Sequence, residues 1–325
     1  MTRVILLLQD LAQAAQDIAR PSTGVPLPVQ RPPGPPPGFS PQEMIKQLVQ
    51  FVGYFLAIGA IGFRFGVVRR IRGMTDEAHG MPRPDNAAFV GMLGAMLLML
   101  SLLGGLYLES FTRKVVIDEI LSGNRLDSFL FRLGMLAVAL VGFRLVRTDR
   151  SIGWALATIG VLGAALQSVY TGKIGGKVNA VHVLAASTWL GTLLVLTIVG
   201  IRGVARSNAT GEQRARRVAD LVNAFSPLAL TCAAIVAITG VTTAWLHLKR
   251  LSALWTTSYG IALIVKLSLV LIVVVLGAWN WRRVRPSLGD EGSEHTIRRS
   301  ATMELTFAAL VLVATSVLVS LPSPK

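Results

Sequence analysis

The chain has 325 residues, of which 52% are hydrophobic and only 15% are charged, and its mean hydropathy is +0.59. Soluble domains carry about 25% charged residues, so this composition excludes a purely soluble enzyme, a disordered protein and a disulfide scaffold. The single cysteine, Cys232, rules out an intramolecular disulfide. The net charge of +15 comes from short basic clusters between apolar blocks, which indicates membrane topology rather than nucleic-acid binding.

The N-terminal segment, residues 1–43, differs in composition from the rest of the chain. Residues 4–19 are predicted to form a short amphipathic helix on the membrane surface. Its apolar core is about five residues long, which is too short for a signal peptide. Residues 21–41 contain nine prolines and favour an extended polyproline II spacer, either a tether or a docking strand.

Long apolar blocks dominate the remaining residues. A helix needs about 20 mostly apolar residues to cross a bilayer, and the blocks of this length are 46–67, 88–108, 128–147, 151–170, 178–201, 222–246, 258–281 and 302–321. Alternating ten-residue patterns are missing. The sequence therefore predicts an all-α polytopic membrane protein with about eight transmembrane helices, divided into a first half (44–170) and a second half (171–325).

The distribution of lysine and arginine predicts the orientation. Eighteen of these residues follow the odd-numbered blocks, whereas twelve lie on the opposite side together with both chain ends. Cytoplasmic loops carry the excess of positive charge. We therefore expect a multi-pass protein of the bacterial inner membrane with both termini in the periplasm.

The two halves are weakly similar to each other. When the third and seventh blocks are aligned at an offset of 134 residues, Arg132 falls on Lys266 and Leu133 falls on Leu267. Each half then holds four spans of the same orientation. This predicts two parallel four-helix repeats, which is a hypothesis of gene duplication.

The second half resembles the CopD family, the copper resistance D membrane proteins, most strongly over residues 178–322. The stretches that carry the resemblance are VHVLAASTWLG (181–191), FSPLALTCAAIVAITGVTTAWL (225–246), LWTTSYGIALIVKLSLVLIVVVLGAWN (254–280) and RRSATMELTFAALVLVATSVLVSLP (298–322). The resemblance implies an inner-membrane protein that handles copper, with a periplasmic copper chaperone as a possible partner. Two positions depart from the family pattern: Lys173 replaces a frequent histidine, and Thr192 replaces a common glycine.

Two of the four histidines are candidate metal ligands. His182 lies near the start of the fifth span, and His247 ends the antiparallel sixth span. Neighbouring antiparallel helices could bring both imidazoles together, where they would suit copper or bracket a haem iron. The alternative is that both histidines only cap helix ends. His79 and His295 are predicted to lie in cytoplasmic loops.

Other residues are weaker candidates. Met92, Met96 and Met99 share one helix face and could relay Cu⁺, although methionine is also an ordinary packing residue. Lys266 and Arg132 lie within apolar spans, where charged side chains face the bundle interior or reach toward the surface. The remaining two are Trp189, interpreted mainly as a packing residue, and Glu304, at the start of the last span.

The sequence thus predicts copper translocation or delivery across the inner membrane. His182 and His247 would be ligands, the three methionines a relay, and Lys266 a gating or anion-balancing charge. Two alternatives stay open: a haem-binding redox subunit that uses both histidines, and a structural subunit of a larger membrane complex docked by its proline-rich tail. No nucleotide-binding or hydrolase motif is present, so no enzymatic activity is expected.

Overall fold

Helices account for every regular element in the part of the chain that the structure describes. This computed structural model describes residues 40–72, 84–171, 174–248, 252–279, 282 and 293–321. No strand occurs among these residues, which confirms the predicted all-α class. The predicted amphipathic segment and nearly all of the proline-rich tail lie outside the described residues.

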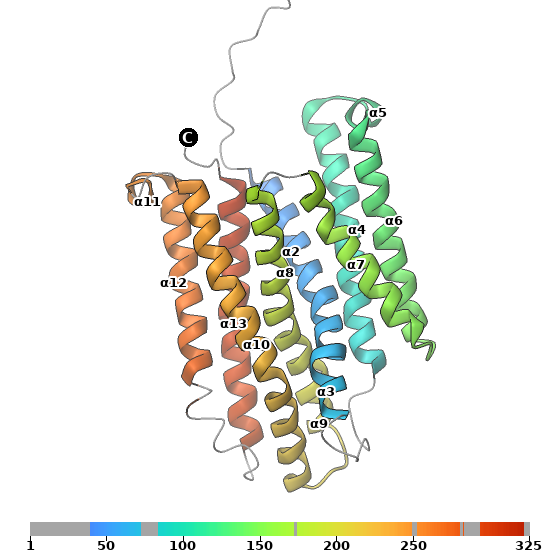
Figure 1. The fold of residues 1–325 in the computed structure, drawn as a ribbon, viewed down its shortest axis with the longest axis vertical. Helices are drawn as coiled ribbons and strands as arrows, with labels where there is room; N and C mark the ends of the chain where they lie inside the picture. Colours follow the sequence, from blue (N-terminus) through green and yellow to red (C-terminus); the bar gives the residue numbers. More distant parts are fainter. Residues whose placement is uncertain are drawn as a thin grey trace, which may run out of the picture. The chain divides into compact units, whose positions relative to one another are not determined.

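The helices follow one another up and down along one common direction (Figure 1). Those of the first half are α2 (Pro41–Gly62), the π-helix η1 (Phe63–Val68), α3 (Arg69–Arg72), α4 (Pro84–Arg113), α5 (Ile117–Ile120), α6 (Asn124–Val146) and α7 (Ile152–Thr171). Those of the second half are α8 (Ile174–Val195), the π-helix η2 (Leu196–Ile201), α9 (Arg202–Ala205), α10 (Gly211–Leu248), α11 (Ala253–Thr256), α12 (Ser258–Trp279) and α13 (Ser293–Ser320).

Within the described residues, seven helices are long and apolar enough to cross a membrane. They are α2 with η1 and α3, α4, α6, α8 with η2 and α9, α10, α12 and α13. The eighth predicted span is α7, a helix of 20 residues whose apolar part, Ile152–Gln167, is shorter. Each predicted block thus corresponds to one helix, and the structure confirms a polytopic membrane protein.

The outer surface of these helices is apolar along their middle. Leu100 on α4, Ile159 on α7 and Leu271 on α12 are each about 60% exposed. Exposure of so many apolar side chains to water would be unfavourable, and large apolar patches mark contact with a protein partner or a membrane. The acyl chains of a bilayer would surround these side chains, so the exposed face is a lipid-facing surface.

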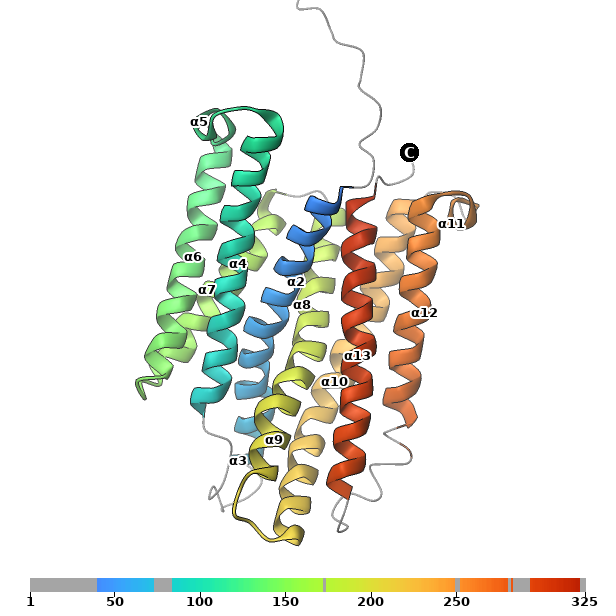
Figure 2. The same ribbon diagram turned by 180° about the vertical axis from the view of Figure 1, so that it is seen from behind.

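Helices α2 and α8 pack against each other at the centre of the bundle (Figures 1 and 2). At their crossing, a Cβ atom added to Gly59 would collide with the backbone of Gly191, and one added to Gly191 would collide with the carbonyl oxygen of Phe55. Small residues let helix backbones approach closely in lipid, where packing contacts drive association. These two glycines therefore set the distance between the halves of the protein.

Equivalent helices recur at a nearly constant spacing in the chain. Helix α2 and its extension through η1 and α3 match α8, η2 and α9 in length, with every boundary shifted by 133 residues. Helix α6 begins 134 residues before α12. Contacts repeat as well, since α4 packs on α2 as α10 packs on α8, and α6 pairs with α7 as α12 pairs with α13. These matches support the predicted pair of parallel repeats.

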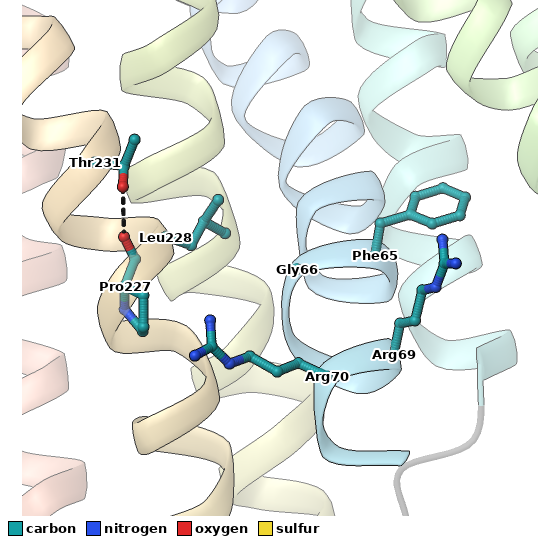
Figure 3. Close-up of a pocket in the computed structure, with 7 residues that line it drawn as sticks. All are labelled: Phe65, Gly66, Arg69, Arg70, Pro227, Leu228 and Thr231. Atoms are coloured by element: carbon teal, nitrogen blue, oxygen red, sulfur yellow. Dashed lines mark hydrogen bonds between the residues drawn. The ribbon is translucent and has the colours of Figure 1, made fainter. Parts of the chain in front are cut away.

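The first of the two π-helices faces a proline in α10. In η1 the helix is widened, and the backbone N–H of Arg69 donates to the carbonyl of Arg64, five residues earlier. Opposite it, Pro227 lies inside α10 and removes one helix hydrogen bond. A pocket opens between the two segments (Figure 3). We call this end of the bundle, which holds α3 and α9, the arginine-rich end.

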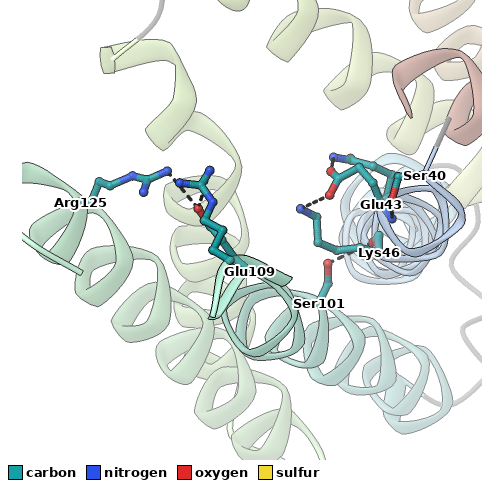
Figure 4. A network of polar contacts seen from close by, with 8 residues as sticks. Ser40, Glu43, Lys46, Ser101, Glu109 and Arg125 are labelled. Carbon is teal, nitrogen blue, oxygen red and sulfur yellow. Dashed lines mark hydrogen bonds and ion pairs between the residues drawn. The ribbon is translucent and has the colours of Figure 1, made fainter. Parts of the chain in front are cut away.

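Polar contacts hold the opposite end of the bundle (Figure 4). Ser40 caps α2 by accepting a hydrogen bond from the N–H of Glu43 at 3.4 Å, and Pro41 occupies the first helical position. Glu43 pairs with Lys46 at 2.6 Å, and the Ser101 hydroxyl of α4 donates to the Lys46 carbonyl at 3.2 Å. This contact ties α4 to the first turns of α2.

The end of α4 is tied to the start of α6 in a similar way. The Glu109 carboxylate contacts Arg113 at 3.1 Å and Arg125 at 3.5 Å. These ion pairs are largely exposed, so each contributes well under about 1 kcal/mol. Their effect is on helix register more than on stability.

Candidate functional site

His182 lies on α8 in contact with α10. Its Nδ1 atom is 3.0 Å from Oγ1 of Thr239. The hydroxyl of Thr239 donates to the carbonyl of Ile235 at 2.6 Å, so its oxygen is free to accept a hydrogen bond. When the hydrogen of a neutral imidazole is on Nδ1, Nε2 keeps its lone pair. In that tautomer the ring can bind a metal ion through Nε2.

Gly240 makes room for the ring. A Cβ atom added at this position would lie 3.2 Å from Cε1 of His182 and 3.6 Å from Nδ1. Contacts near 3.2 Å are tighter than side chains ordinarily tolerate, so an alanine here would push the imidazole away. The Thr239–Gly240 pair thus fixes one edge of the ring and opens space beside it.

Lys266 on α12 is the third residue of the group. It is partly buried and interacts electrostatically with His182. His182 and Lys266 each lie eight residues after the start of their helix, and Thr239 lies nine residues before the end of α10. At 1.5 Å per residue, all three are about 12–14 Å from the same helix ends. We call this group, His182, Thr239 and Lys266, the imidazole site.

The depth of His182 differs from the sequence prediction. Its span was expected to begin at residue 178, but α8 begins at Ile174, one turn earlier. The imidazole is therefore about 12 Å from the helix start, twice the expected distance. Polar residues early in α8 continue the helix beyond its apolar part, which hydropathy alone does not reveal.

The predicted pairing with His247 stays a prediction. Residue 247 lies in α10, but its side chain is outside the described set. Its backbone is eight residues, about 12 Å along the helix, from Thr239, which His182 contacts. His79, Lys173 and the side chain of His295 also lie outside the described residues.

The methionine face lies apart from the imidazole site. Met92 and Met99 pack against the hydrophobic core, and Met96 is 49% exposed. Helix α4, which carries them, packs on α2 and α6, whereas α8 packs on α2 and α10. In the described part of the chain, no three His, Cys, Asp or Glu side chains converge as a metal-binding cluster.

Three other predicted residues occupy different places. Arg132 on α6 is partly buried, and its Nε atom lacks a hydrogen-bond partner among the described residues. Trp189 on α8 packs against two hydrophobic clusters, in agreement with its interpretation as a packing residue. Glu304 is partly buried in α13. None of the three joins the imidazole site in the described structure.

The two remaining sequence features are packing positions. Cys232 is buried on α10. Thr192 is fully buried, and its Oγ1 atom occupies the space that a Cβ on Gly62 would fill. The residue where the family commonly has a glycine thus packs against a glycine of α2.

Sequence reasoning missed Thr239 and Gly240. Both stand in the stretch 225–246, but a threonine in an apolar helix usually bonds to its own backbone, as Thr242 does to Ile238. The signal that could have found them is the distance of each residue along its helix from one membrane face. Residues of two neighbouring antiparallel helices can contact each other when these distances are equal. His182 and Thr239 satisfy that condition.

The fold defines a polytopic, all-helical membrane protein, with an imidazole that contacts a neighbouring helix within its second half. Residues 219–318 match the model of the family described as Copper resistance protein D. This match confirms the predicted resemblance over α10, α12 and most of α13.

A curated relative points to the same metal. The chain is 26% identical over 179 residues to the copper transport protein CutJ of Bacillus subtilis (strain 168). The alignment covers 53% of this chain and 31% of that relative. The chain therefore matches about a third of the length of this relative. No solved structure matches the chain. Both matches are to copper-related proteins, and neither supports the haem alternative.

Proposed function

We propose that this protein moves copper across the bacterial inner membrane, or delivers copper through it, without catalysing a chemical reaction. The observation that carries the proposal is the imidazole of His182, whose Nδ1 lies 3.0 Å from Oγ1 of Thr239, an arrangement that leaves Nε2 for a metal when Nδ1 carries the hydrogen. Imidazole is a good copper ligand. The family match includes most of α10, the helix that holds this ring in place.

The small number of ligands favours passage over storage. Within the described residues, no three His, Cys, Asp or Glu side chains form a cluster that could hold a metal ion. A site with one fixed imidazole and few partners would hold a metal ion weakly and release it readily. In this proposal His182 is the entry ligand of a transfer path.

Lys266 gives the path a charge selectivity. Its ammonium group near His182 repels a bare Cu⁺ ion and attracts an anionic partner of the metal. A copper ion that arrives with a negatively charged ligand would meet less repulsion at the site. Lys266 therefore acts as the gating or anion-balancing charge.

We further propose that the imidazole site opens toward the periplasm. The arginine-rich end is the opposite end of the bundle and is the end expected in the cytoplasm. A soluble periplasmic copper chaperone is then the natural donor or acceptor of the metal. Because α2 packs between α4 and α8, the methionine face is left out of this first binding step.

The test is copper retention by purified protein. We expect His182→Ala to lower the copper bound per protein at least tenfold after growth with added copper. Mutation of a residue that hydrogen-bonds to a metal ligand typically lowers metal affinity 10–100-fold, and removal of the ligand itself should cost at least as much. The matched control is Val181→Ala, which changes the neighbouring residue, a side chain 45% exposed to lipid. Unchanged copper in His182→Ala would refute the assignment of His182, whatever the protein's transport activity.

A further inference from the structure

The pocket at the arginine-rich end is separate from the imidazole site. It has a volume of about 810 Å³ and lies between η1, α3 and α10. Ligand pockets commonly measure about 300–1,000 Å³, so it can hold a substantial ligand. The pocket contacts none of the three residues of the imidazole site.

Two unlike surfaces line this pocket. Phe65, Pro227 and Leu228 contribute apolar atoms, whereas Arg69 and Arg70 contribute positive charge. Figure 3 shows Arg70 reaching toward α10 and Arg69 beside Phe65. Of the described residues that line the pocket, none is acidic.

The two arginines are available for a ligand. Both are exposed, and in the part of the chain that the structure describes neither forms an ion pair. They follow directly on η1, where the π-helix changes the phase of the next turn. π-Helical turns occur frequently at functional sites. Here the turn puts two guanidinium groups at the end of an apolar groove, that of Arg70 toward α10 and that of Arg69 beside Phe65 (Figure 3).

The backbone shapes the apolar part of the groove. A Cβ atom added to Gly66 would lie 2.8 Å from Cδ2 of Leu228, so the glycine lets η1 approach α10 closely. Pro227 interrupts the hydrogen bonds of α10, and the Thr231 hydroxyl donates to the Pro227 carbonyl at 2.9 Å. The Thr231 hydroxyl is thereby engaged within its own helix, and Pro227 and Leu228 contribute an apolar wall.

We propose that this pocket binds an anionic phospholipid, with Arg69 and Arg70 on its phosphate and the groove along its acyl chain. Basic pockets between helices near one membrane face recognise acidic headgroups, and guanidinium groups bind phosphate through paired hydrogen bonds. The apolar wall would add nothing for a free phosphate ion. A lipid uses both surfaces of the pocket.

The test compares lipid retention by the full-length protein in mild detergent. Native mass spectrometry would measure phosphatidylglycerol against phosphatidylcholine with identical acyl chains. We expect wild type to retain phosphatidylglycerol preferentially. Each of Arg69→Gln and Arg70→Gln should lower that preference about fivefold, and the double variant should lower it about 25-fold, because one positive charge near a lipid surface has an effect of that size.

Arg202→Gln is the matched control. Arg202 begins α9 as Arg69 begins α3, it is also exposed, and it lies outside the pocket. We expect this variant to retain phosphatidylglycerol as wild type does. An equal loss in Arg202→Gln would mean that general surface charge, and not the pocket, binds the lipid.

A second variant tests the groove without changing charge. Thr231→Phe should fill the pocket from α10 and lower phosphatidylglycerol retention at least fivefold. Unchanged retention in Thr231→Phe, or in the double arginine variant, would overturn the proposal. A third experiment compares the effects of inorganic phosphate and phosphatidylglycerol on the melting temperature of the wild-type protein. If millimolar phosphate raises the melting temperature as much as phosphatidylglycerol does, the pocket binds a free anion and the lipid proposal is wrong.

Discussion

The hydrogen bond between His182 and Thr239 shows how one residue gains a chemical role from its neighbour. Alone, an imidazole in an apolar helix can rotate and can carry its hydrogen on either nitrogen. The Thr239 oxygen accepts a hydrogen bond because its own hydrogen goes to Ile235. The contact that orients the ring thus comes from a threonine that the sequence pattern did not single out.

This interpretation predicts a specific effect of Thr239→Val. The variant keeps the volume of the side chain and removes the acceptor for Nδ1, so copper affinity should fall about 10–100-fold, as for other residues that orient metal-bound histidines. Copper titration of the purified protein measures it. Thr242→Val is the control, because it is the same substitution in the same helix. The Thr242 hydroxyl donates to the Ile238 carbonyl, whereas the hydroxyl next to His182 is that of Thr239. Equal losses in both variants would contradict an orienting role for Thr239.

At the scale of elements, the close crossing of α2 and α8 decides the architecture. Gly59 and Gly191 face each other there, and α2 also packs against α4 while α8 packs against α10. Glycines are frequent in the sequence of these spans. The sequence does not tell which glycines meet, because the contact depends on the rotation of each helix about its axis.

Substitution of Gly191 should therefore destabilise the fold. A Cβ at this position would collide with the Phe55 carbonyl, so we expect Gly191→Ala to lower the free energy of unfolding by about 1–3 kcal/mol. Denaturation in mixed detergent micelles measures the change. Gly104→Ala is the control, since a Cβ atom added to Gly104 would have nothing within 4 Å. A Gly191→Ala protein as stable as Gly104→Ala would show that the two helices can separate at no cost.

At the scale of the whole molecule, the two halves share a pattern of helices and differ at the position of His182. Arg132 and Lys266 occupy the same position, eight residues into α6 and α12. At the shift of 133 residues that relates α2 to α8, the counterpart of His182 is Val49. The first half therefore repeats the charge of Lys266 without the imidazole of His182.

The orientation of the whole bundle is open to a direct test. In a Cys232→Ala background, Glu119→Cys places a thiol on the exposed helix α5, and Arg216→Cys places one near the start of α10. We expect an impermeant maleimide added to intact spheroplasts to label the Glu119→Cys variant only, because the arginine-rich end should face the cytoplasm. Labelling of Arg216→Cys alone would invert the topology and close the proposed periplasmic entrance.

The sequence by itself determined the helices of this protein and their order. Apolar blocks about 20 residues long define spans in lipid, because every backbone polar group must be satisfied within its own helix. It also singled out His182 and Lys266, because polar side chains are costly in such spans.

Only the tertiary structure decided which side chains meet. Helix rotation and depth set the contact of His182 with Thr239, the separation of the methionine face on α4 from α8, and the pocket beside Pro227. The physical reason is that hydropathy is almost unchanged when a helix turns or slides in lipid, whereas each contact between helices depends on both movements.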